Sequence, residues 1–132
     1  MTHKTRAQLI AGLDSFTRSY LVTALWSSTD NSREDGGDPL DRNYGIEDCS
    51  RETLLGAIKD CGAFRDDCAE MLDTCGVDDS SQWGHDFWLT RCGHGAGFWD
   101  GGYPKHGAAL TAACRPYGGV DLYVHRGRIY GA

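Results

Sequence analysis

The sequence predicts a single α+β domain in which two N-terminal amphipathic helices pack on a small antiparallel sheet. Up to about residue 76, apolar residues recur at the three- and four-residue steps of helices. From residue 83 onward, glycine and aromatic residues accumulate and apolar positions alternate with polar ones, as in strands. A chain of 132 residues is long enough to bury one hydrophobic core, so we expect one domain over residues 1–132.

The first helix is expected over residues 6–26 because its apolar residues form one stripe along a helical surface. The stripe comprises Leu9, Leu13, Phe16, Tyr20 and Ala24. The next segment, residues 27–49, contains a Gly-Gly pair, Pro39 and several Asp and Asn residues that interrupt both helical and strand periodicity. It is predicted to be a long acidic loop.

The second helix is expected to begin at Ser50, a favoured N-cap residue, and to end near Cys75, with Gly76 at the C′ position. Cys61, Cys68 and Cys75 lie seven residues apart on its apolar stripe. Steps of about 10 Å along a helix are too long for one metal ion, so these thiols are predicted core residues. The opposite face is predicted to bind a partner through Asp60, Asp66, Asp67, Glu70 and Asp73.

The stretch GHDFWLTRCGHGAGFWDGGY, residues 84–103, is predicted to form a hairpin. HDFWLTR alternates with a period of two, GFWDGGY begins a second extended run, and the glycines between them suit a tight connection. Residues 104–117 are expected to form a short helix with one apolar face. A closing strand or hairpin with its turn at HRGR is expected over residues 122–130.

The charge distribution narrows the classes of partner. The net charge is −6, and residues 30–80 contain fifteen acidic and five basic residues. This distribution argues against duplex nucleic acid as a partner, because proteins that bind a duplex present a basic face to its phosphates. The N-terminal residues lack the apolar segment of a secretion signal, and no stretch approaches the roughly 18 apolar residues of a membrane span. We therefore expect a soluble protein that stays in the cytoplasm with reduced cysteines.

The predicted hairpin also holds the densest group of residues that can carry chemistry. Aromatic rings can stack on a base, and an arginine beside turn N–H groups can hold a phosphate or carboxylate. The predicted ligand-binding residues are Trp88, Arg91, His94, Trp99 and Tyr103. The alternative is that the aromatic side chains fill the core and the glycines serve only the turns.

Catalysis and metal binding are further interpretations of the same hairpin. The candidates for an acid–base reaction are His85, Asp86, His94 and Asp100, with Ser27, Ser28 or Cys92 as the nucleophile. A GxSxG nucleophile motif is absent. The potential metal ligands His85, Cys92, His94 and His106 do not follow a recognised spacing. We therefore assign no catalytic residue, metal or cofactor from the sequence.

Three segments together resemble a known family. ALWSST, PLDRNYGIED and HDFWLTRCGHGAGFWDGGY are similar to small uncharacterised proteins encoded by bacteriophages and prophages. In that family the third segment commonly reads HDFWLTR, one variable residue and GHGAGFWD, so Cys92 stands at the variable position. The resemblance extends from about Leu21 to Tyr130. It implies a phage origin and action in the cytoplasm of the bacterial host, without an established activity or assigned catalytic residues.

The resemblance and the acidic middle third together favour an accessory binding protein that modulates a host or defence component, such as an anti-CRISPR-like inhibitor. The acidic helix face would meet a basic groove on a protein partner, and the hairpin would hold a nucleotide or other small ligand. One alternative is a small hydrolase or transferase that acts on a nucleotide or nucleic acid through the hairpin. A structural or assembly protein is the other.

Overall fold

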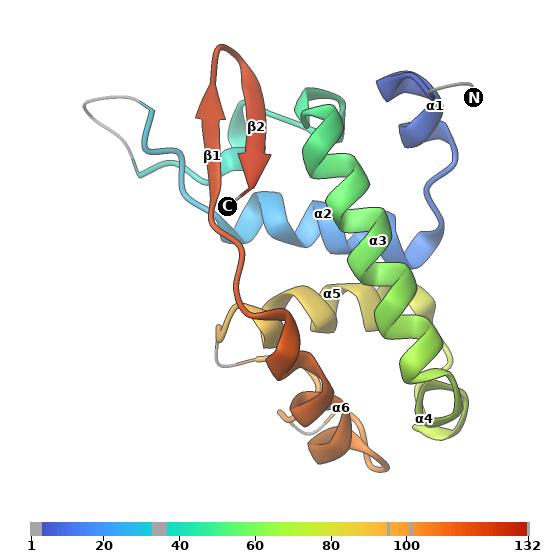
Figure 1. Ribbon diagram of the computed structural model, residues 1–132. Coiled ribbons are helices and arrows are strands. Elements are labelled where there is room, and N and C mark those ends of the chain that lie inside the picture. Colours follow the sequence, from blue (N-terminus) through green and yellow to red (C-terminus); the bar gives the residue numbers. More distant parts are fainter. Residues whose placement is uncertain (1–3, 33–36, 95, 101, 132) are drawn as a thin grey trace.

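The computed structural model describes residues 4–32, 37–94, 96–100 and 102–131, and in this part of the chain α-helices dominate (Figure 1). The helices are α1 (Arg6–Ala11), α2 (Ser15–Ser27), α3 (Arg51–Asp67), α4 (Ala69–Thr74), α5 (Ser80–Arg91) and α6 (Gly107–Cys114). The sheet in the same residues is one antiparallel hairpin of β1 (Leu122–His125) and β2 (Arg128–Gly131). The predicted packing of two N-terminal helices on a sheet is therefore wrong, because the helices pack mainly on one another.

The first predicted helix is divided into α1 and α2. Gly12 ends α1, and the Asp14 side chain caps α2 by accepting a hydrogen bond from the Thr17 backbone N–H at 2.8 Å. A short side chain that satisfies a free N–H group favours a new helix start over continuation of the old helix. The predicted apolar stripe is nevertheless correct, since Phe16 and Tyr20 are buried in the core.

The second predicted helix begins where the sequence indicated. Ser50 Oγ accepts from the Thr53 N–H at 3.1 Å, and the chain continues through α3 and, after a break at Cys68, through α4. Gly76 follows with φ +90°, which glycine adopts without strain. All six cysteines are free thiols, and the predicted core residues Cys61 and Cys75 are fully buried.

The segment predicted as an acidic loop, residues 27–49, contains short helical turns in its described part; residues 33–36 lie outside the described residues. Its 3₁₀ turns are η1 (Leu40–Arg42) and η2 (Ile46–Asp48). Leu40 is completely buried and Ile46 nearly so. The second half of this acidic segment therefore belongs to the folded core.

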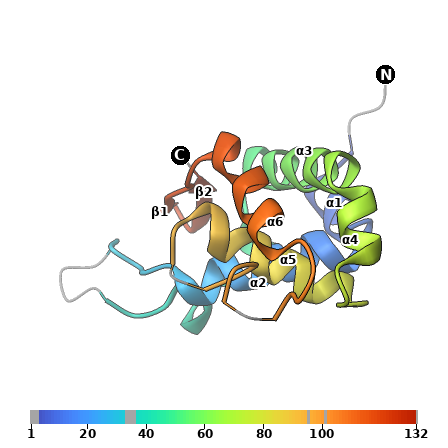
Figure 2. The same cartoon turned by 90° about the horizontal axis from the view of Figure 1, so that it is seen from below.

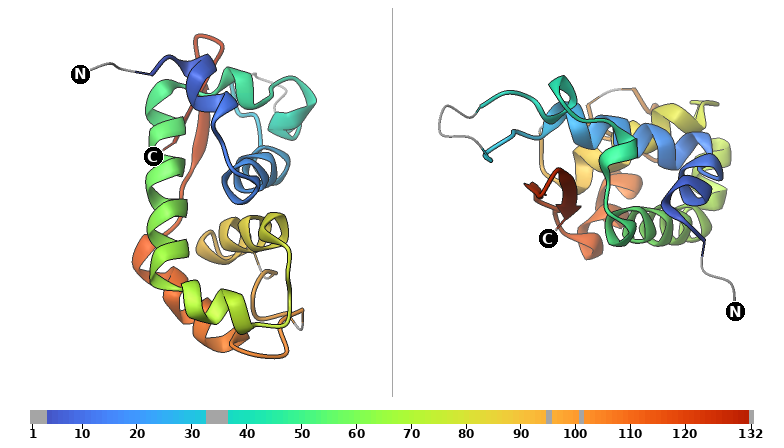
Figure 3. Two further views of the ribbon diagram at one scale, coloured as in Figure 1. Left: turned by 90° about the vertical axis from the view of Figure 1, so that its right-hand side faces the viewer. Right: turned by 90° about the horizontal axis from the view of Figure 1, so that it is seen from above.

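Helices α2 and α5 form the central pair of the domain, and α3 crosses both of them on one side (Figure 3). Their close approach depends on Gly84 of α5, where a Cβ atom would overlap the backbone oxygen of Phe16 in α2. Seen from below, α6 and the loop that precedes it lie against α5 (Figure 2). Helix α5 is therefore enclosed by protein on several sides.

The enclosure of α5 explains why its secondary structure was predicted incorrectly. HDFWLTR was expected to be a strand but forms the last two turns of α5, which Asp79 caps by accepting from the N–H groups of Ser81 and Gln82. Phe87 and Leu89, whose alternation indicated a strand, are both buried, and so is Trp88 between them. A helix that is buried around most of its circumference lacks the one-sided apolar stripe on which sequence prediction relies.

GFWDGGY was expected to be the second strand of the hairpin, but its described residues form turns and bends. Gly95 and Gly101 of the motif lie outside the described residues. Phe98 and Tyr103 are buried and hold this segment against the core. The short helix expected over residues 104–117 is confirmed as α6, which continues into the 3₁₀ turn η3 (Arg115–Tyr117).

The closing hairpin is confirmed with its turn in the predicted HRGR sequence. Arg126 and Gly127 both have positive φ angles, as a two-residue type I′ connection requires. Strand β2 lies beside the start of α3, because the Ile129 carbonyl accepts from the Ser50 N–H at 2.9 Å and the Thr53 hydroxyl at 2.9 Å. Ile129 is fully buried, so the hairpin is part of the single core.

Candidate functional site

Residues 96–100, 102 and 103 turn back against α5, so the ends of the 84–103 motif still meet although its described residues form no hairpin. The Phe98 N–H donates to Thr90 Oγ1 at 3.1 Å. Gly97 has a φ of +124°, and a Cβ atom there would overlap Thr90 Oγ1 and lie 3.0 Å from the Asp86 carbonyl oxygen, so this position requires glycine. The return of the chain brings Tyr103 beside Asp86, two residues that the sequence placed at opposite ends of the motif.

Asp86 is the buried polar centre of the motif, with only 4% of its surface exposed. Its Oδ2 atom accepts from Gln82 Nε2 at 2.9 Å and from the Tyr103 hydroxyl at 2.6 Å, and its Oδ1 accepts from His85 Nδ1 at 2.8 Å. Burial and the hydrogen bond to Asp86 raise the pKa of Tyr103, which keeps its hydroxyl a donor. Asp86 therefore connects three side chains from α5 and the returning segment.

His85 is held by this network and remains accessible, with 35% of its side chain exposed. Its ring lies 5.9 Å from the ring of Trp26, which is itself 44% exposed. A histidine oriented by a buried carboxylate is the arrangement that a general base needs. A different histidine, His94, lines the polar cleft between the ends of α2 and α5. The histidine that a carboxylate orients is therefore not the histidine that reaches the cleft.

Arg91 lies at the centre of a second network, which joins α5 to three other parts of the chain. Its Nη1 donates to the Tyr20 hydroxyl at 3.0 Å and to Asp60 Oδ2 at 2.9 Å. Its Nε and Nη2 donate to the carbonyl oxygens of Gly118 and Tyr117, both at 2.8 Å. The side chain is 3% exposed, and the guanidinium also lies over the Phe87 and Tyr117 rings, 5.6 Å from each centroid.

These contacts keep Arg91 charged inside the protein. Burial alone would lower the pKa of Arg91, but interactions with Tyr20 and Asp60 outweigh burial and raise it. Arg91 was predicted to hold a phosphate or carboxylate of a ligand. In the structure its guanidinium instead fixes α2, α3 and the segment that precedes β1 around α5, so these internal partners already use four of its donor interactions.

The five predicted ligand-binding residues do not gather in one pocket. Trp88 and Tyr103 are buried like Arg91, whereas His94 and Trp99 are exposed. The Trp88 indole N–H donates to Ser27 Oγ at 2.7 Å, so the polar atom of this side chain already has a partner within the fold. Of the five, only Trp88 and His94 line a common cleft.

This polar cleft lies between the end of α2, the end of α5 and the segment that leads into β1, and its volume is about 500 Å³. It is lined by Ser27, Ser28, Thr29, Asn31, Trp88, Cys92, His94 and residues 119–123. The volume falls within the range of small-molecule sites, roughly 300–1,000 Å³. Sequence reasoning missed Asn31 and Asp121, because they belong to segments far from the motif and follow no pattern of their own.

The nucleophile candidates in this cleft are not activated in the structure. Burial raises the pKa of the Cys92 thiol, which favours the unreactive protonated form. Ser27 Oγ contacts the Trp88 indole N–H and the Ala24 carbonyl rather than a histidine. The cleft therefore offers hydroxyl, amide, imidazole and carboxylate groups for binding a polar molecule, but its geometry shows no serine–histidine or cysteine–histidine pair among the described residues.

The predicted partner-binding carboxylates differ in their availability. Asp60 is committed to Arg91 and is only partly exposed. The other four, Asp66, Asp67, Glu70 and Asp73, are exposed at the end of α3 and on α4, and none has an ion pair with another residue that the structure describes. We call these four residues the acidic face; Figure 1 shows its helices at the edge of the domain.

Comparisons with known proteins add no functional assignment, since no family model, curated protein or solved structure matches the chain. Within the described ranges, no group of three or more His, Cys, Asp or Glu residues is placed to hold a metal ion. The helices of the same ranges are all too short or too polar to cross a lipid bilayer.

Proposed function

We propose that the chain is a binding protein, a phage-encoded accessory factor that docks on a basic surface of a host or defence protein in the bacterial cytoplasm. The observation that carries this proposal is the contrast between two groups of charged residues. The charged side chains of the 84–103 motif that are buried, Asp86 and Arg91, make their contacts within the fold. The acidic face has no such partners and is presented to the solvent.

The surface of α3 supports the proposal because this helix, whose last two residues belong to the acidic face, also exposes apolar side chains. Leu55 and Ile58 of α3 are 38% and 36% exposed. Apolar positions beside a charged rim are typical of protein interfaces, in which the apolar part supplies affinity and the charges guide association. The resemblance to phage proteins supports the setting, an infected bacterium in which the target is a host or defence protein.

Charge reversal tests this proposal directly. The variant Asp66→Lys/Glu70→Lys should weaken binding to the partner at least tenfold, because attraction to a basic surface becomes repulsion. The partner is captured from a bacterial lysate with the tagged protein, purified, and titrated with each variant at several salt concentrations. Binding of the unmodified protein should weaken as salt rises, and binding of the variant should depend less on salt.

The matched control is Asp41→Lys/Glu47→Lys, which changes the net charge equally at exposed positions outside α3, α4 and the polar cleft. This control should bind the partner within about twofold of the unmodified protein, since net charge alone contributes little at physiological ionic strength. Equal binding by both double variants, or equal losses in both, would contradict docking on the acidic face.

The enzymatic alternative, a hydrolase or transferase acting on a nucleotide or nucleic acid, is favoured by the His85–Asp86 hydrogen bond. Purified protein incubated with the nucleoside triphosphates and single-stranded oligonucleotides should give no products above the blank if the chain only binds. His85→Ala is the diagnostic variant and His94→Ala its control. Turnover that disappears with His85→Ala and survives in His94→Ala would replace the binding proposal with the enzymatic one.

A further inference from the structure

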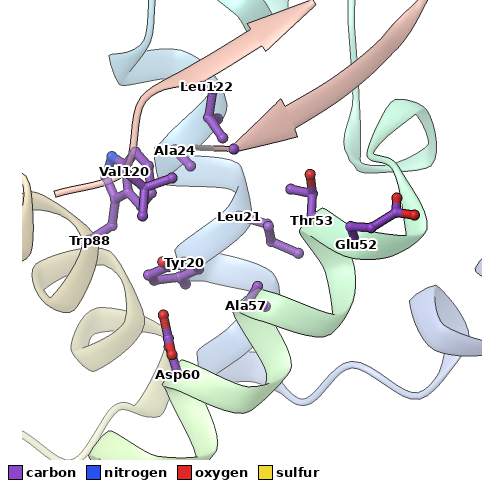
Figure 4. Close-up of a pocket in the computed structure, with 12 residues that line it drawn as sticks. Tyr20, Leu21, Ala24, Glu52, Thr53, Ala57, Asp60, Trp88, Val120 and Leu122 are labelled. Atoms are coloured by element: carbon purple, nitrogen blue, oxygen red, sulfur yellow. The ribbon is translucent and has the colours of Figure 1, made fainter. Parts of the chain in front are cut away.

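A second cavity lies between α2, α3, α5 and the segment that carries β1, and it contains none of the acidic face (Figure 4). Its volume is about 150 Å³. A protein cavity of similar size, lined by apolar side chains, is known to admit benzene. This cavity can therefore hold one ring or a short branched chain.

The walls of the cavity are mainly apolar. They are formed by Tyr20, Leu21, Ala24, Gly56, Ala57, Trp88, Val120 and Leu122, together with Thr53 and Gly131. The Tyr20 and Trp88 rings meet edge to face, with centroids 5.3 Å apart and an interplanar angle of 86°. Two rings fixed in this way give a rigid aromatic wall on which an apolar group loses little conformational freedom.

The charged residues that line the cavity are both acidic. Glu52 and Asp60 lie on α3 at opposite ends of the cavity, and the Asp60 carboxylate points toward Tyr20 (Figure 4). Arg91 compensates the charge of Asp60. Glu52 is exposed and has no ion pair with any described residue, so the Glu52 end of the cavity carries a negative charge next to the solvent, with its carboxylate directed away from the aromatic wall (Figure 4).

We propose that this cavity binds a small apolar group that carries a positive charge, the chemistry of an arylalkylamine. The ring would enter beside Tyr20 and Trp88, and the ammonium group would remain at the mouth in the field of Glu52, where it stays partly hydrated. The proposal does not depend on docking at the acidic face, because the two sites share no residue.

Gly56 both lines the cavity and is exposed, so it lies at the mouth, where the cavity meets the solvent. It lies in the middle of α3, and a Cβ atom added there would meet no atom within 4 Å. A longer side chain at this position would therefore occupy the mouth without disturbing the fold. Gly62 is the matched control, because it lies in the same helix, has the same open surroundings and does not line the cavity.

The test uses 2-phenylethylamine as the probe and 3-phenylpropionate as the ligand of similar size and opposite charge. Protein-observed NMR titrations of the full chain should show saturable shifts at Leu21, Gly56 and Leu122 with the amine, with a Kd on the order of 1 mM. The carboxylate should bind at least fivefold more weakly. Gly56→Met should reduce amine affinity at least tenfold, and Gly62→Met should change it less than twofold.

Both methionine variants should remain folded, because glycine is less favourable in a helix than methionine. Circular dichroism confirms this before each titration. Three results would overturn the proposal: no saturable shift at the lining residues, equal or tighter binding of the carboxylate, or equal effects of the two methionine variants. None of these results would bear on docking at the acidic face, which the charge-reversal variants test separately.

Discussion

Replacing Arg91 with methionine is expected to lower the free energy of unfolding by about 2–4 kcal/mol. The substitution removes the partner of the Asp60 carboxylate and leaves the Tyr117 and Gly118 carbonyl oxygens without their donor. The Asp60 side chain is about one-third exposed, so water can solvate its carboxylate and offset part of the lost ion pair. The Tyr20 hydroxyl also loses its Arg91 donor, and because Tyr20 is 3% exposed, water replaces little of that hydrogen bond.

Urea unfolding monitored by circular dichroism measures this change, and Arg128→Met is the control because Arg128 lies exposed on β2. The control should stay within about 0.5 kcal/mol of the unmodified protein. Arg91→Lys should recover little stability, since one ammonium group cannot reproduce the planar set of donors that reaches three elements. If Arg91→Met were as stable as the control, the guanidinium would be free for a ligand, as the sequence suggested.

The second large effect is expected for Gly84→Ala, which should lower the free energy of unfolding by about 1–3 kcal/mol or more. The added Cβ would lie 2.9 Å from the Phe16 carbonyl carbon and would overlap its oxygen. Both atoms belong to the backbone of α2, so no side chain can rotate away. Helices α2 and α5 must separate, and the packing of Phe16 against Phe87 loosens with them.

Gly62→Ala provides the comparison for this effect. Alanine is favoured over glycine in a helix by about 0.5–1 kcal/mol, and the Cβ at residue 62 would meet no atom within 4 Å. Urea unfolding should therefore show the two glycine-to-alanine variants shifting stability in opposite directions. A stabilised Gly84→Ala variant would show that α2 and α5 are not in close contact at this point.

The elements that could be predicted from sequence are those whose ends have their own local signals. Ser50 and Gly76 mark the start and end of the α3–α4 segment, because N-capping and a positive φ angle depend on neighbouring residues alone. The HRGR turn belongs to the same class, since Arg126 and Gly127 adopt the angles that the short connection requires. The cysteine stripe was equally readable because it repeats along one helix.

Helix α5 could not be predicted from its alternating pattern because its surroundings come from distant parts of the chain. Gln82, His85 and Asp86 look like surface residues in the sequence. In the structure Asp86 is buried and accepts hydrogen bonds from Gln82, His85 and Tyr103. A local signal for this helix did exist in Asp79, an N-cap residue followed by two serines, but the period-two alternation of the next residues obscured it.

The roles of the candidate site residues could not be predicted for the same reason, because they depend on contacts with distant parts of the chain. Arg91 and the aromatic residues of the motif have the composition of a ligand site, and only tertiary contacts reveal that Tyr20 and Asp60, 71 and 31 residues away, use the arginine internally. The cavity proposed to bind an amine combines α2, α3, α5 and β1, so no contiguous motif indicates it. The acidic face was visible from sequence because it lies on two consecutive helices.

Hydrogen–deuterium exchange of the chain with and without its captured partner tests the central proposal, docking on the acidic face, most directly. Amides near Asp66 and Glu70, together with the exposed apolar positions Leu55 and Ile58, should exchange more slowly in the complex. The polar cleft near His94 should be unchanged. Slower exchange confined to that cleft, with α3 and α4 unaffected, would contradict the proposed docking surface.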